Sequence, residues 1–117
     1  MNDGNIRLEV FFFRSELGSE PVRDWLKSLP FDEKRIIGED IKTVQFGWPL
    51  GMPIVRKLDS GLWKVRSRLA DKIGRVIFTL RDQKMVLLDG FIKKSDKTPQ
   101  DDLKVAHQRL AQVRGEK

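Results

Sequence analysis

Apolar residues recur along the chain with two different periods, and these periods predict the order of its secondary structure. Spacings of three to four residues predict amphipathic helices, whereas alternating or continuous short runs predict strands. The helical period runs from Ser19, a predicted N-cap, to Pro30, and again from Asp32, a second predicted N-cap, to Val44. A last helix is expected over residues 98–113, and strands are expected over residues 8–13, 55–58, 62–69, 75–81 and 85–91.

The order of these elements predicts the fold class. Residues 46–53 contain two glycines and two prolines, so they form a loop between the second helix and the later strands. We therefore expect a single α+β domain over residues 1–117, with two N-terminal helices, one C-terminal helix and a twisted, mainly antiparallel sheet of four to five strands. The helices are expected on one face of the sheet, with the other face partly open and basic. Residues 85–91 are almost continuously apolar, which is typical of a central strand.

Basic residues are concentrated in one segment of the chain. The net charge is +6, and residues 57–97 contain eleven basic and five acidic residues, so this segment carries the whole excess. A localised excess of this kind favours an anionic partner, usually a nucleic acid. Charge alone leaves a second interpretation open, in which the strands simply have a solvated surface.

Composition also excludes several classes of protein. The chain has no cysteine, which rules out disulfides, thiolate metal sites and cysteine nucleophiles, and fits a cytoplasmic protein. No run of apolar residues exceeds four, far too short for a membrane span or a signal peptide. There is no nucleotide-binding glycine loop and no cluster of metal-binding side chains, so we expect neither a cofactor nor a metal.

Side chains alternate across a strand, which places several cations on one face of the predicted sheet. Lys64, Arg66 and Arg68 share a face of their strand, and Arg75 of the next strand lies near them if the two strands form a hairpin. Further cations follow the last strand at Lys93, Lys94 and Lys97. Like charges are unfavourable side by side unless an anion neutralises them, and a phosphodiester is such an anion.

Metal-free RNA cleavage needs a base for the 2′-hydroxyl, a cation for the crowded phosphorane and an acid for the leaving oxygen. Cations are plentiful, but tyrosine is absent, and the single histidine, His107, lies beside the apolar stripe of the last helix, where a packed or edge position is expected. Lysine is the remaining base, because neighbouring cations lower its pKa. Lys64, Lys93 and Lys94 are the candidates.

Four aromatic residues are candidates for stacking on unpaired bases or for the core. Trp25 and Trp63 are expected in the core. For Phe91 and Trp48 both interpretations stay open, and we include them among the nucleic-acid-binding candidates.

Three stretches of the chain resemble the HigB-like branch of the RelE/ParE toxin superfamily. They are GLWKVRSR at residues 61–68, GRVIF at 74–78 and LLDGFIKKSDKTP at 87–99. Ala106 and Arg109 are similar to the last helix of that family, and PVRDWLKSLP at 21–30 is similar to its N-terminal part. The resemblance covers roughly residues 8–112. Many family members have Glu at the position of Lys64 and Tyr at that of Phe78, so this chain departs from the pattern there.

The resemblance implies a RelE-like fold and the toxin of a type II toxin–antitoxin system, a metal-independent endoribonuclease that enters the ribosomal A site of the 30S subunit and cuts mRNA. It also implies a helix-turn-helix antitoxin as partner, through which alone operator DNA is bound, and no membrane. The expected site has two parts. The cleavage set is Lys64, Arg66, Arg75, Lys93 and Lys94, and the nucleic-acid-binding set is Arg68, Phe91, Lys97 and Trp48.

Two other functions are compatible with the same sequence. The first is a ParE-like inhibitor of DNA gyrase, which would produce DNA breaks rather than cut transcripts. The second is an inactive module that binds nucleic acid or a protein partner and leaves growth unaffected.

Overall fold

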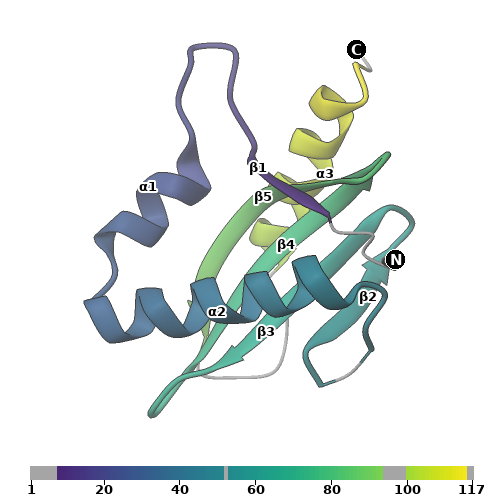
Figure 1. Ribbon diagram of the computed structural model, residues 1–117. Helices are drawn as coiled ribbons and strands as arrows, with labels where there is room; N and C mark the ends of the chain where they lie inside the picture. The colour runs from purple at the N-terminus through teal and green to yellow at the C-terminus, as the bar shows by residue number, and fades with distance from the viewer. Residues whose placement is uncertain (1–7, 52, 94–99, 116–117) are drawn as a thin grey trace.

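The computed structural model describes residues 8–51, 53–93 and 100–115, which form five strands and three helices (Figure 1). This content confirms the predicted α+β fold with two helices before the main strands and one helix after them. In chain order the elements are β1 (Glu9–Phe12), α1 (Pro21–Ser28), α2 (Phe31–Gly47), β2 (Val55–Asp59), β3 (Leu62–Arg68), β4 (Ile73–Arg81), β5 (Lys84–Lys93) and α3 (Gln100–Val113).

The strands form one mixed sheet in the order β1-β5-β4-β3-β2. Strands β2 to β5 are consecutive and antiparallel, because each is joined to the next by a short connection. The β4–β5 connection is only two residues long, and Asp82 takes a positive φ of 58° there, a conformation that aspartate tolerates better than most residues. Strand β1 is added at the edge, parallel to β5.

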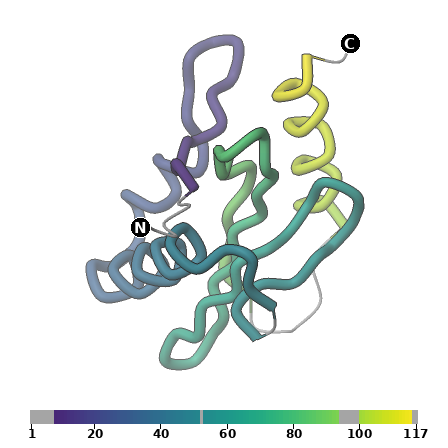
Figure 2. Tube along the Cα trace, turned by 45° about the vertical axis from the view of Figure 1, so that its right-hand side comes forward, coloured from purple at the N-terminus to yellow at the C-terminus, as the bar shows by residue number. Residues whose placement is uncertain are grey.

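Helices α1 and α2 cover one face of the sheet, whereas α3 lies on the opposite face (Figure 2). The prediction that all helices share one face is therefore wrong. The physical reason lies in β4 and β5, whose apolar side chains point to both faces. Phe78 and Leu87 pack beneath α2, while Ile77 and Leu88 point the other way and are buried against α3. A strand pair that is apolar on both sides needs cover on both sides.

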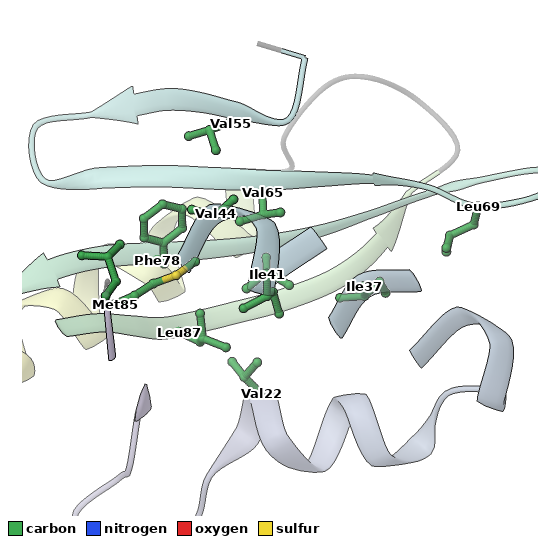
Figure 3. Packing of buried hydrophobic residues seen from close by; sticks show 12 residues of the cluster. Val22, Ile37, Ile41, Val44, Val55, Val65, Leu69, Phe78, Met85 and Leu87 are labelled. Atoms are coloured by element: carbon green, nitrogen blue, oxygen red, sulfur yellow. The ribbon is translucent and has the colours of Figure 1, made fainter. Parts of the chain in front are cut away.

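The larger core lies between the sheet and the first two helices (Figure 3). Val22 of α1 and Ile37 and Val44 of α2 are at most 1% exposed and point at the sheet. They meet Val65 of β3 and Leu87 of β5, so the helical and strand periods of the sequence bury their apolar faces against each other.

Both predicted N-caps differ from the observed ones. The hydroxyl of Ser19 lies 2.8 Å from that of Ser15 and closes the loop before α1, so Glu20 occupies the N-cap position. Helix α2 begins at Phe31, earlier than predicted, so Asp32 falls within the first turn, where its charge still favours the helix N-terminus. The predicted start of the last helix at Thr98 and Pro99 lies outside the described residues.

None of the helices in the described part of the chain is long and apolar enough to cross a membrane.

A substitution at Gly90 tests the packing of α1 against the sheet. A Cβ atom at this position would overlap Cε3 of Trp25 and lie 2.5 Å from its Cζ3. Because Trp25 is held between α1 and the core, we expect Gly90→Ala to lower the free energy of unfolding by about 1–3 kcal/mol. A Cβ atom added at Gly38 of α2 would meet nothing within 4 Å, so Gly38→Ala should instead raise stability by about 0.5–1 kcal/mol. Urea denaturation of both variants measures the two changes, and equal effects would contradict the packing described for Trp25.

Candidate nucleic-acid interface

The strand register brings the predicted cations together on the face of the sheet that α3 partly covers. Arg66 of β3 lies directly opposite Arg75 of β4, which lies opposite Phe91 of β5. A second row on the same face runs through Arg68, Ile73 and Lys93, and a third through Arg56, Lys64, Ile77 and Asp89. We call these six cations the basic face: Arg56, Lys64, Arg66, Arg68, Arg75 and Lys93. The predicted pairing of Arg75 with the cations of β3 is thus confirmed.

The cations of the basic face differ in their exposure. Arg68 and Arg56 are exposed, and Arg66 is half-buried. In contrast, Lys64 is 3% exposed and Arg75 is 0% exposed, and both interact with other groups of the protein. The sequence analysis expected these two residues on a partly open face, and the structure buries both. In this conformation they can act on a bound anion only through their charge, and direct contacts fall to the more accessible Arg56, Arg66 and Arg68.

Three candidate lysines lie at and beyond the end of β5. Lys93 is the last residue of the strand, half-buried and opposite Ile73, one row away from Arg75 and Phe91. Lys94 and Lys97 lie outside the described residues, so their predicted roles stay predictions.

The two candidate stacking residues are separated by the sheet. Phe91 lies on the basic face beside Arg75, but it is only 9% exposed and packs in the core beneath α3. Trp48 follows α2 and lies on the other face, with its ring edge-on to Trp63 at a centroid distance of 5.5 Å and to Phe78 at 5.7 Å. Trp48 therefore does not share a site with the basic face, because the helix that carries it packs on the opposite side.

A β-bulge in β5 adds an acidic residue that is absent from the predicted site. Ile77 pairs with Asp89 and Phe78 with Leu87, so Leu88 has no cross-strand partner, and Leu88 and Asp89 both belong to the α3 side. Asp89 is 9% exposed. The signal in the sequence was a single carboxylate within the apolar run of residues 85–91, because a charge in a central strand must be buried.

Asp89 contacts two charged groups of α3. Its Oδ1 lies 3.6 Å from Nη1 of Arg109, which donates a 2.7 Å hydrogen bond to the carbonyl oxygen of Leu88 in the bulge. The carboxyl of Asp102, in the first turn of α3, lies within hydrogen-bonding reach of Asp89. Burial, with the nearby Asp102 carboxyl adding to it, raises the pKa of Asp89 to about 7, although Arg109 opposes this. Asp89 is therefore a carboxyl that holds a proton close to neutral pH.

The single histidine lies away from this cluster. His107 of α3 is exposed, and its Nε2 lies 3.1 Å from Oδ2 of Asp59 at the end of β2. This agrees with the expected edge position. Within residues 8–51, 53–93 and 100–115, no group of three or more histidine or acidic side chains could hold a metal ion.

The chain is similar to one known family over most of its length. The sequence model of the family described as "Phage derived protein Gp49-like (DUF891)" matches residues 24–111, three quarters of the chain and the whole of α2 to β5. No curated protein matches the chain in sequence.

The raised pKa of Asp89 predicts a specific dependence of stability on pH. Asp89 binds a proton more tightly in the folded state, with a pKa of about 7, than at its ordinary value of 3.8. Its contribution to stability is therefore full below about pH 4 and is lost as the pH rises through 7. The substitution Asp89→Asn keeps the shape of the side chain but removes the group that ionises, so the variant does not lose stability as the pH rises. It should be about 1–3 kcal/mol more stable than wild type at pH 8.

Urea denaturation at pH 5, 6, 7 and 8 measures this effect. The difference between the variant and wild type should grow with pH up to about 7 and then level off, because Asp89 is then ionised. A difference that is constant across the series would show that Asp89 has an ordinary pKa in the folded protein.

Proposed function

The chain belongs to the phage-derived Gp49-like family, which is associated with toxin–antitoxin systems, and from this premise we propose that it is the toxin of a type II pair, a ribosome-dependent endoribonuclease that cuts mRNA. The resemblance of residues 61–99 to the HigB-like branch supports the finer part of this proposal. The proposed partners are a helix-turn-helix antitoxin, the 30S A site and mRNA in the cytoplasm, with operator DNA bound only through the antitoxin.

The observation that carries the proposal is the direct pairing of Arg66 with Arg75 on the basic face. Arg66 and Arg75, which also interact with other groups of the protein, concentrate positive charge at one place on the sheet, and such a concentration favours an anionic partner. Arg68 and Lys93 lie one row further along the same face and extend the positive charge over three strands. A phosphodiester chain fits a surface of this charge, and its binding should weaken steeply with salt.

The chemistry proposed for this surface needs no metal. A base, for which Lys93 and Lys94 are the candidates, takes the proton of the 2′-hydroxyl as its oxygen attacks the adjacent phosphorus. The bond to the 5′-oxygen breaks and that oxygen takes up a proton, which leaves a 2′,3′-cyclic phosphate and a 5′-hydroxyl. Guanidinium groups stabilise the negative charge that builds up on the phosphorane, and Arg66 is the half-buried arginine placed to do so directly. Lys64 and Arg75 add their positive charge from beneath the surface, and Lys93 and Lys94 complete the proposed set. Arg68 and Lys97 are assigned to binding the flanking phosphates.

Mapping of mRNA 5′-ends after induced expression in a bacterial host tests the proposal. We expect growth arrest with new cuts in translated reading frames, and the cuts should vanish when translation is blocked beforehand. Intact transcripts with DNA breaks would overturn the nuclease and favour a gyrase inhibitor. Normal growth with salt-sensitive RNA binding would favour an inactive binding module.

Variants on the two sides of the sheet locate the site in the same assay. The double variant Arg66→Ala, Arg68→Ala should lower cleavage by about 10²-fold, because it removes the arginine proposed to stabilise the phosphorane and one that binds a flanking phosphate. Arg35→Ala is the matched control, since Arg35 lies exposed on α2 in a surface ion pair with Glu39. Circular dichroism of all purified proteins establishes that they are folded. Equal loss of cleavage in both would show that the basic face is not the site.

A further inference from the structure

The Asp89 carboxyl is buried beside a second carboxyl, and a bound proton stabilises this pair. Its Oδ2 atom is fully buried and accepts no hydrogen bond from a donor in the part of the chain that the structure describes. The carboxyl of Asp102 lies within hydrogen-bonding reach of Asp89, and two carboxylates cannot both stay ionised at such close range. One shared proton turns this repulsion into a hydrogen bond between the two side chains.

The same carboxyl is placed next to the basic face. Asp89 and Lys64 both lie opposite Ile77, on either side of it, and Arg75 is the diagonal neighbour of Asp89 on β4, a spacing of about 7–8 Å between backbone positions. The charged groups that face Asp89 are therefore Asp102 and Arg109 from α3, Lys64 from β3 and Arg75 from β4. Arg109 favours the ionised form of Asp89, whereas burial and the Asp102 carboxyl favour the protonated form.

We propose that the Asp89–Asp102 pair is a proton site coupled to the basic face, so that a phosphate chain and a proton bind together. This inference rests on the proposed RNA-binding function. A phosphate bound on the basic face adds negative charge on the same side of the sheet as Asp89, and a nearby negative charge favours the protonated carboxyl. At an effective dielectric constant of about 20, a unit charge about 12 Å away favours the protonated carboxyl by about tenfold.

The sequence leaves little else to titrate in the relevant range. The chain has one histidine and no cysteine, and His107 is paired with Asp59 at the far side of α3. A change of RNA affinity between pH 6 and pH 8.5 can therefore be assigned with two variants, Asp89→Asn for the proposed site and His107→Gln for the control.

The experiment measures binding of a fluorescent ten-residue oligouridylate by anisotropy, at fixed ionic strength, from pH 5.5 to 8.5. Uracil and the phosphodiester do not titrate between pH 6 and 8, so the protein supplies any dependence. We expect wild type and His107→Gln to bind about three- to tenfold more weakly at pH 8.5 than at pH 6. Asp89→Asn should match wild type at pH 6 and keep that affinity at pH 8.5.

A second variant, Asp102→Asn, tests the proposal even if Asp89→Asn does not fold. Asp102→Asn removes the facing carboxylate but leaves Asp89 buried, so the midpoint of the pH dependence should move to lower pH. If wild type binds RNA with the same dependence as both Asn variants, the proton coupling is overturned while the proposed function stands. If no variant binds RNA at any pH, the proposed function itself is overturned.

Discussion

The apolar character of β4 and β5 on both of their faces is the constraint on which the rest of the molecule depends. Phe78 and Leu87 require α1 and α2 on one side, and Ile77 and Leu88 require α3 on the other. Helix α3 packs over the part of the second face that includes Leu62 at the start of β3. The cations lie at the opposite end, where β3 ends, β4 begins and β5 ends. The burial of the core thus leaves only part of the basic face accessible, at Arg56, Arg66, Arg68 and Lys93.

This arrangement concentrates an electrostatic cost at one place. Arg66 faces Arg75, and Arg75 and Lys64 are buried, so positive charge is held where water screens it poorly. All three side chains also interact with other groups of the protein. Asp89 lies at the border between this region and the apolar core of α3, and burial is the main cause of its raised pKa, with Asp102 adding to it and Arg109 opposing it.

The two periods of the sequence were sufficient to predict the fold class and to predict which residues of β3 and β4 share a face of the sheet. Alternation alone places Arg66 and Arg75 on one face, and the hairpin pairs them directly. Alternation fails in β5, because the bulge at Leu88 shifts the pattern by one residue and brings Asp89 to the basic side. The sequence also could not predict on which face of the sheet Trp48 lies, since this depends on which face α2 covers. Burial of Lys64 and Arg75 could not be foreseen either, because it depends on packing by segments distant in sequence.

The central claim is that the sheet face carrying Arg66, Arg68 and Arg75 binds RNA. Nuclear magnetic resonance tests it most directly, by following backbone amide and arginine side-chain shifts of the labelled protein during titration with an oligouridylate. We predict that the largest changes occur in the second half of β3, the first half of β4 and the end of β5, with α2 unaffected. Changes centred on α2 and Trp48, or the absence of any localised change at low salt, would contradict the account.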